Sequence, residues 1–167
     1  GVRLRGIESA RVPVEVQEAV ACAEAIILCP SNPIVSVGPI LAVPGMRKLL
    51  STSPAPKVAV SPIVGGRALK GPADRMLQSL GHEVSATGVA RMYEGWIDGF
   101  VVDRADGEEA GISSLGMCVL ATDAVMRAMP SIASSRLMPS LSSWPRDSAS
   151  GWPWRSREAG WCACRVI

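Results

Sequence analysis

Short apolar runs alternate with longer segments of helical periodicity along the first 129 residues. In the longer segments apolar residues recur every three or four positions, which is typical of helices with one buried face. The short runs are rich in Ile, Val and Leu, as are strands that are buried on both faces. Strands are therefore predicted at residues 25–28, 57–60, 99–102 and 117–121, and helices at residues 14–24, 45–51, 73–80, 87–93, 107–115 and 123–129.

This alternation predicts an α/β fold, in which a Rossmann-like parallel sheet forms the middle of three layers and helices cover both faces. Proline and glycine positions support the helix bounds. Pro13 and Pro72 suit a first helical turn, and Gly81 suits the position after a last turn. Residues 31–39 are rich in Pro, Asn and Gly and are expected to form a loop, and residues 64–71 a glycine loop.

Composition places the chain among folded proteins. Its 48% of hydrophobic residues, and 16 Gly without a strict period, exclude disordered and collagen-like chains. No apolar run reaches the roughly 18 residues of a membrane-spanning helix, and no leader pattern follows Gly1. We therefore expect a cytoplasmic protein without membrane association. The five Cys show no paired spacing, so Cys22, Cys29 and Cys118 are expected to be small buried thiols.

Charge and composition change near Pro130. Residues 1–130 hold 12 Lys and Arg against 13 Asp and Glu, whereas residues 131–167 hold 5 Arg against 2 acidic residues. Because the basic charge lies in the tail, the body gives no electrostatic reason to expect nucleic-acid binding. We predict a partial α/β domain over residues 1–129 and an atypical Ser-, Trp- and Arg-rich tail over residues 130–167.

The tail holds four of the five Trp and shows neither a helical nor a strand period. One hypothesis is a disordered extension, although disordered segments are poor in aromatic residues. The other is a shifted reading frame, because one permitted back-translation of residues 129–144, read two bases on, encodes an amphipathic helix. Resequencing the coding region separates the two hypotheses. Neither gives the tail a function.

The loop after the first predicted strand is a candidate ligand site. In open α/β sheets, ligands bind beyond the carboxyl ends of the strands. Ser31 and Asn32 offer a hydroxyl and an amide that can hydrogen-bond a heteroaromatic ring or a phosphate, and Pro33 fixes the backbone. The alternative is a turn with local side-chain caps.

The loop after the second strand is another candidate, and it runs from Ser61 through Gly65 and Gly66 to Lys70. The glycines let backbone N–H groups approach an anion, and Arg67 and Lys70 add positive charge. The motifs GxxxxGK[ST] and GxGxxG are both absent, so this is neither a Walker A loop nor the dinucleotide-binding fingerprint. The alternative is a glycine turn with solvated cations.

Asp103 and Asp123 follow the last two predicted strands. Carboxylates at this edge could hold Mg²⁺ or orient a hydroxyl, and the alternative is helix capping. Because His82 is the only histidine, a Ser-His-Asp triad has little support. No catalytic residue is assigned.

The same loops carry a family resemblance. Residues 29–45, CPSNPIVSVGPILAVPG, resemble the GPSNPxxSIGPILAVPG block of the 2-phospho-L-lactate transferase family, which makes the deazaflavin coenzyme F-420. Residues 60–74, VSPIVGGRALKGPAD, resemble its SPIxGGxALKGPAD block. Residues 84–90, 98–103 and 119–123 follow in the family's order, so that the resemblance extends from Gly6 to Met129.

The resemblance implies a transferase that moves a phospholactyl or phosphoenolpyruvyl group from a GDP-activated donor to the terminal hydroxyl of the deazaflavin Fo. GMP would leave, and Mg²⁺ would be required. The family's members are longer and often dimeric, which implies a sheet incomplete at its N-terminus, metal ligands upstream of Gly1 and a homodimer. The implied substrate-binding residues are Ser31, Asn32 and Pro33 against the deazaflavin or donor, and Ser61, Gly65, Gly66 and Lys70 near the donor phosphates.

Two other functions stay open at this point. One is a non-catalytic nucleotide-sugar-binding regulator of the related gluconeogenesis-factor type, and the other is an inactive truncated product. Binding of Fo separates the transferase from the regulator. The sequence does not distinguish a lactyl from an enolpyruvyl donor.

Overall fold

The computed structural model of this protein describes residues 2–125. The expected domain boundary near Pro130, the tail and most of the helix expected at residues 123–129 lie outside the described residues. The first three positions of that helix are described, and they are not helical.

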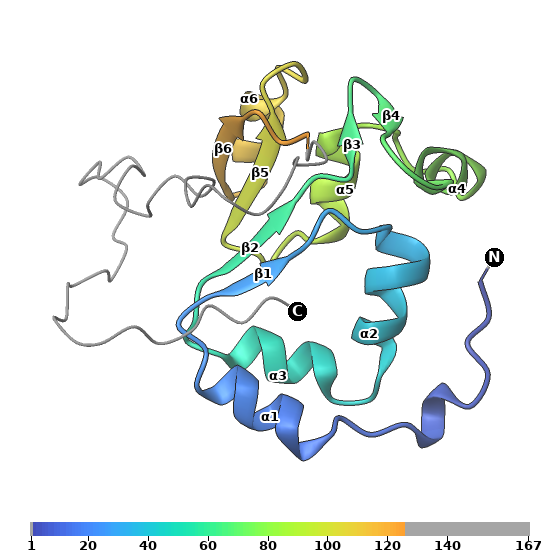
Figure 1. The fold of residues 1–167 in the computed structure, drawn as a ribbon, viewed down its shortest axis with the longest axis vertical. Coiled ribbons are helices and arrows are strands. Elements are labelled where there is room, and N and C mark those ends of the chain that lie inside the picture. The colour runs from blue at the N-terminus through green and yellow to red at the C-terminus, as the bar shows by residue number, and fades with distance from the viewer. Residues whose placement is uncertain (1, 126–167) are drawn as a thin grey trace, which may run out of the picture. The chain divides into compact units, whose positions relative to one another are not determined.

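Four parallel strands form the central sheet, in the order β1-β2-β5-β6 (Figure 1). The pairing aligns Leu28 with Ala59, Ala59 with Phe100 and Phe100 with Val119. Each predicted strand is present, and the predicted parallel α/β class is confirmed. The strands are β1 (Ile26–Leu28), β2 (Lys57–Val60), β5 (Gly99–Asp103) and β6 (Cys118–Thr122).

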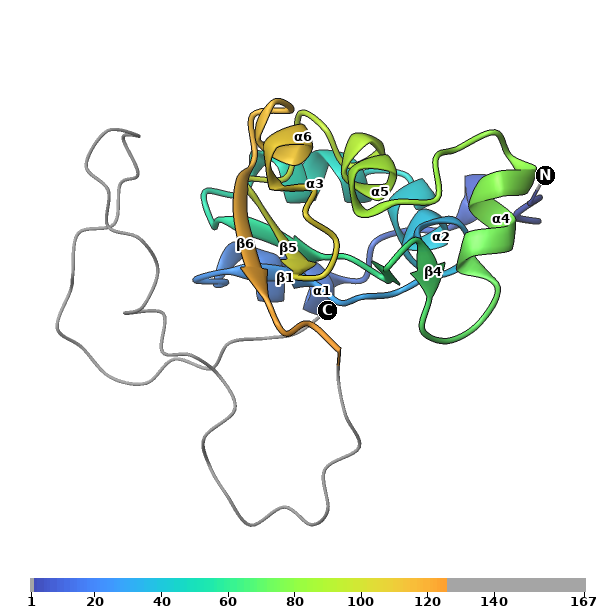
Figure 2. The ribbon, with the colours of Figure 1, turned by 90° about the horizontal axis from the view of Figure 1, so that it is seen from above.

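Helices connect successive strands of the sheet. Three of them, α3, α5 and α6, lie together on one face (Figure 2). The strands follow one another in a single direction across the sheet, so right-handed crossovers place their connections on the same side. These three connecting helices therefore cover the same face of the sheet. The helices are α1 (Val14–Ala21), α2 (Gly38–Ala42), α3 (Met46–Thr52), α4 (Ala73–Ser79), α5 (Ala86–Met92) and α6 (Glu109–Ser113).

The core lies between the helices and one face of the sheet. Ala59, Phe100 and Val102 point to this face and are fully buried. Alternate residues of the same strands, such as Val58 and Val101, point to the opposite face and are only half-buried. The strands thus carry apolar residues on both faces, as their sequences indicate, but the described helices cover one face more completely.

The prediction of a loop at residues 31–39 is wrong from Pro33 onward. A helical turn at Pro33–Val37 runs directly into α2. It is wider than an α-helix, because the N–H of Val37 bonds the carbonyl of Asn32, five residues back, at 3.1 Å. Pro33 occupies the first turn of this helical segment, where a missing N–H costs nothing. Pro39 lies in the first turn of α2, directly after the wide turn. The prolines start helices here.

The predicted glycine loop contains a short antiparallel hairpin of β3 (Ile63–Val64) and β4 (Arg67–Ala68). Gly65 and Gly66 form its two-residue turn, with φ values of 59° and 71°. Positive φ at both positions defines a type I′ turn, which favours glycine and matches the twist of the strands. The glycine pair therefore shapes a hairpin tip.

Other expectations have mixed outcomes. Gly81 ends α4 as predicted, with φ 76° and a hydrogen bond from the N–H of His82 to the carbonyl of Leu77. The expectation of buried thiols is wrong for Cys22, which is exposed, whereas Cys29 and Cys118 are half-buried. Within residues 2–125, no single helix is long and apolar enough to cross a membrane; Pro33–Ala42 and Met46–Thr52 reach that length only as a pair bent by 87°.

Candidate functional site

The bend at residues 31–33 and the glycine hairpin leave the sheet at the same edge (Figure 1). They follow β1 and β2, which are adjacent and parallel. Helix α4, which follows the hairpin, contacts the turn at Pro33–Val37. The amide Nδ2 of Asn32 also donates a hydrogen bond to the Sδ of Met76 in α4, at 3.4 Å. The structure therefore brings the two predicted loops together.

Asn32 uses its amide oxygen locally. Its Oδ1 accepts hydrogen bonds from the N–H groups of Ile34, at 2.8 Å, and Val35, at 3.3 Å. These contacts cap the wide turn, as the alternative interpretation of this loop expected. Ser31 is half-buried, and Pro33 is buried at the start of the turn. Both Asn32 and Pro33 thus contribute to the local fold, whatever they bind.

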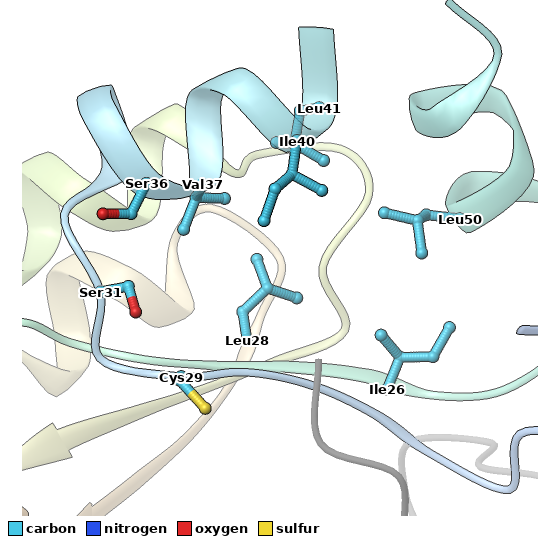
Figure 3. A pocket seen from close by; sticks show the side chains of 9 residues that line it. All are labelled: Ile26, Leu28, Cys29, Ser31, Ser36, Val37, Ile40, Leu41 and Leu50. Carbon is cyan, nitrogen blue, oxygen red and sulfur yellow. The ribbon is translucent and has the colours of Figure 1, made fainter. Parts of the chain in front are cut away.

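An apolar cavity of about 110 Å³ lies between β1, α2 and α3. Six of its side chains point toward one another from the strand and the helices, and Ser31 and Ser36 lie at one side (Figure 3). The sulfur of Cys29 points away from this space. The volume is below the roughly 300 Å³ of common ligand pockets, so the cavity suits a small apolar group. The apolar lining residues are Ile26, Leu28, Val37, Ile40, Leu41 and Leu50.

A second hollow, of about 300 Å³, has a cation in its wall. Besides Arg47 and Tyr93, apolar residues and Pro33 line it. The Arg47 guanidinium lies 5.7 Å from the centre of the Trp96 ring, and Tyr93 meets that ring edge-on, with centroids 5.9 Å apart. Burial raises the pKa of Tyr93, which keeps its phenol neutral. This hollow can receive an uncharged or anionic group.

Ser61 is buried, and its hydroxyl is engaged by the hairpin. The hydroxyl donates to the carbonyl of Ile63 at 2.8 Å and accepts from the Ile63 N–H at 3.1 Å. The backbone N–H of Ser61 bonds the carbonyl of Val101 in β5. Ser61 therefore anchors the base of the hairpin to the sheet.

Asp106 anchors the tip of the same hairpin. Its Oδ1 accepts a hydrogen bond from the N–H of Gly65 at 2.6 Å, across 41 residues of sequence. That N–H, predicted to face a phosphate, is thus already engaged by a carboxylate. Asp106 is a residue that sequence reasoning missed, because no local pattern links it to Gly65. Burial is the main cause that raises the pKa of Asp106.

Asp103 holds two backbone segments through its carboxylate. One of its carboxylate oxygens accepts the N–H of Ala105 and the other the N–H of Ala124, each at 3.0 Å. These bonds, that of Ala105 above all, lower the pKa of Asp103. The segments around Ala105 and Ala124 are not helical, so these bonds hold a turn and the stretch after β6 and are not the helix capping of the alternative; Asp123 is exposed.

Glu108 closes the N-terminus of α5. Its carboxylate accepts the N–H of Thr87 at 2.6 Å and that of Ala86 at 3.4 Å. Ser85 completes the cap, since its hydroxyl accepts the N–H of Gly88 at 2.8 Å. The protein's own side chains thus satisfy the first N–H groups of α5, and sequence reasoning missed this role of Glu108 as well.

Arg67 and Lys70 are exposed at this edge. Neither takes part in an ion pair with another described residue; the ion pairs within residues 2–125 are Lys57–Asp98 and Arg91–Glu83. Exposed guanidinium and ammonium groups at the carboxyl ends of parallel strands can bind phosphate oxygens.

The described residues do not fit a magnesium site. Across residues 2–125, no group of three or more His, Cys, Asp or Glu side chains is placed to hold a metal ion. Both oxygens of Asp103 already accept backbone hydrogen bonds.

Comparisons with a family model and with individual known proteins agree on one family. The family model described as 2-phospho-L-lactate transferase CofD matches residues 3–118. The chain is 42% identical to the 2-phospho-L-lactate transferase of Methanosarcina mazei over 127 residues, which cover 75% of the chain and 41% of the relative. It is 44% identical to the phosphoenolpyruvate transferase of Kitasatospora aureofaciens over 125 residues, which cover 71% of the chain and 39% of the relative. The matches span about two fifths of the relatives' length.

Proposed function

This chain belongs to the 2-phospho-L-lactate transferase family, and on that basis we propose that it takes part in the synthesis of the deazaflavin coenzyme F-420. The proposed reaction transfers a phospholactyl or phosphoenolpyruvyl group from a GDP-activated donor to the terminal hydroxyl of Fo. Relatives named for each of the two groups have similar identity to this chain, 42% and 44%, so both donors enter the proposal.

One observation carries the proposal. The two segments with the strongest family resemblance, residues 29–45 and 60–74, leave adjacent parallel strands at a single edge of the sheet. That edge is where α/β folds bind their ligands. The hydrogen bond from Asn32 in the first segment reaches Met76 in α4, the helix that begins at the end of the second segment.

The proposed reaction is a phosphoryl transfer. The terminal hydroxyl oxygen of Fo forms a bond to the phosphorus that carries the lactyl or enolpyruvyl group. The bond from this phosphorus to the GMP oxygen breaks, so GMP leaves and a phosphodiester forms. The hydroxyl proton passes to solvent or to a base that we do not assign. Cations and N–H donors around the phosphates stabilise the developing charge.

In this proposal Lys70 and Arg67 contact the donor phosphates, because their charges are exposed at the edge and unpaired within residues 2–125. Gly66 offers close backbone approach at the hairpin tip. Ser31 faces the deazaflavin or the donor beside the apolar cavity. Ser61, Asn32 and Pro33 would act mainly through the shape of the two loops, and Mg²⁺ and a homodimer remain expectations.

A transfer assay tests the proposal directly. The 167-residue chain is incubated with Fo and lactyl- or enolpyruvyl-diphosphoguanosine in the presence of Mg²⁺. Mass spectrometry should detect GMP and the new phosphodiester in equal amounts. Separate calorimetry measures binding of GDP and of Fo. A chain that forms no product and binds neither molecule would contradict the proposal, and nucleotide-sugar binding without Fo binding would favour the regulator.

Replacing Lys70 tests the phosphate contact. Loss of one charge-assisted hydrogen bond in Lys70→Met should weaken GDP binding by about tenfold, measured by calorimetry. Lys48→Met is the matched control, because Lys48 is also exposed but lies on α3. Equal GDP affinity in the two variants would remove Lys70 from the proposed site.

A further inference from the structure

Residues 103–108, which are the end of β5 and the loop after it, tie three other segments together through carboxylates. Asp103 bonds the N–H of Ala124 after β6, and Glu108 bonds the first N–H groups of α5. Asp106 bonds the N–H of Gly65 at the hairpin tip. These contacts gather at the same edge of the sheet as the two family segments, since β2 and β5 are parallel neighbours.

The contact of Asp106 differs from those of Asp103 and Glu108. Within residues 103–108, Asp106 is the residue that bonds the tip of the hairpin. Ser61 fixes the base of the hairpin to β5, at Val101. Asp106 fixes the tip at Gly65, with a short bond of 2.6 Å. Arg67 lies two residues after this tip. The direction of the hairpin, and with it the placement of its cations, therefore depends on contacts at both ends.

The carboxylate of Asp106 also destabilises the fold more than a simple turn contact requires. Its Oδ2 is buried and has no hydrogen-bond partner within residues 2–125. Asp103 and Glu108 lie close enough to disfavour its charge. A buried carboxylate oxygen without a partner destabilises the fold. Such local destabilisation is typical of positions that serve a site and not the stability of the fold.

We propose that Asp106 is a positioning residue of the candidate site: by holding the N–H of Gly65, it fixes the double-glycine turn and so sets Arg67 and Lys70 at the ligand edge. The part of this inference that concerns the ligand rests on the proposed function. The part that concerns the turn rests only on the contacts above.

Two variants of Asp106 and one control test the proposal in the full chain. Asp106→Ala removes the acceptor, whereas Asp106→Asn keeps an amide oxygen in the same place. Glu109→Ala is the control, because Glu109 is a nearby acidic residue whose side chain makes no hydrogen bond or ion pair with another residue of the range 2–125. NMR measures the exchange rate of the Gly65 amide hydrogen, and calorimetry measures the affinity for GDP.

We expect Asp106→Ala to speed Gly65 exchange and to weaken GDP binding, each by about tenfold. Asp106→Asn should restore most of both, and Glu109→Ala should change neither by more than about twofold. Amide exchange in β5 reports whether each variant keeps its fold. Unchanged Gly65 exchange in Asp106→Ala overturns the positioning of the turn.

Faster Gly65 exchange with unchanged GDP affinity overturns the link from the turn to the ligand. A native chain that binds no GDP contradicts the proposed function, and in that case the exchange of Gly65 alone decides whether Asp106 holds the turn. Failure of Asp106→Asn to restore slow exchange also overturns the proposal, because the acceptor oxygen would then not be what matters.

Discussion

Gly88 in α5 lies very close to the backbone of Glu83. A Cβ atom added there would lie 2.2 Å from the carbonyl oxygen of Glu83, far inside a normal contact. The helix comes this close to the preceding segment because Ser85 caps it, with a hydroxyl that accepts the Gly88 N–H. A backbone carbonyl cannot swing aside like a side chain, so only glycine fits without a shift of the main chain.

Gly88→Ala should therefore lower the free energy of unfolding by about 2–3 kcal/mol, as overpacking of a buried position does. Urea denaturation followed by circular dichroism measures the change. Gly111→Ala is the comparison, because its nearest neighbour is the Thr87 hydroxyl at 3.1 Å, a side-chain atom. A loss in Gly111→Ala as large as that in Gly88→Ala would contradict the explanation.

Asp103 makes stability depend on pH. Hydrogen bonds, that from the Ala105 N–H above all, lower its folded-state pKa below the ordinary value of 3.8. The ionised form is thus favoured in the folded state, and its contribution is complete above the unfolded-state pKa. The contribution should disappear as the pH falls below about 4 and through the folded-state pKa. Urea denaturation between pH 6 and 3 should show a smaller loss of stability in Asp103→Asn than in the native chain. The same dependence of stability on pH in both proteins would contradict this role of Asp103.

At the scale of elements, the wide turn at Pro33–Val37 depends on Asn32. Its Oδ1 satisfies two N–H groups that the turn leaves free, and its Nδ2 reaches Met76 in α4. The turn then passes into α2 without a break. A single side chain therefore sets both the start of the helical segment and its distance from α4.

Asn32→Ala should lower the free energy of unfolding by about 1 kcal/mol, the usual effect of losing an N-terminal cap. Asn32→Asp keeps the oxygen acceptor, adds a negative charge that is favourable at the start of a helical turn, and loses the contact with Met76, so it should lose less stability. Denaturation curves of the two variants measure the difference. Equal losses would show that the Met76 contact, and not the cap, holds the turn.

At the scale of the whole molecule, the two faces of the sheet are covered unequally. Adjacent residues of β5 illustrate this: Val102 is fully buried against the helices, and Val101 is half-buried on the opposite face. Val58 and Val60 lie with Val101 on that second face. A partly exposed group of β-branched residues favours association with other apolar surfaces.

A Val→Thr exchange at each of these two neighbours tests the asymmetry. Val102→Thr buries a hydroxyl and should lower the free energy of unfolding by about 1–3 kcal/mol. Val101→Thr should change stability by less than about 1 kcal/mol and should reduce self-association. Static light scattering and urea denaturation measure the two effects. Similar losses of stability at both positions would contradict the unequal covering.

The sequence predicted the elements well where local chemistry decides them. The apolar runs became the four strands, and Pro72 and Gly81 bound α4 as expected. The error at residues 31–39 arose because Pro and Asn favour turns and helix starts alike, and only the contacts of Asn32 distinguish the two. The sequence also could not predict which face of the sheet the helices cover. Strands that are apolar on both faces are compatible with helices on either one.

The parallel α/β class, the family and the two loops at one edge could be predicted from the sequence, since periodicity, glycine and proline act over a few residues. What those loops do with their polar groups depends on long-range packing. Ser61 and Asn32 are engaged locally, and Gly65 is held by Asp106, 41 residues away. Such partners are fixed by how the strands pair, and strand pairing joins residues that no local pattern connects.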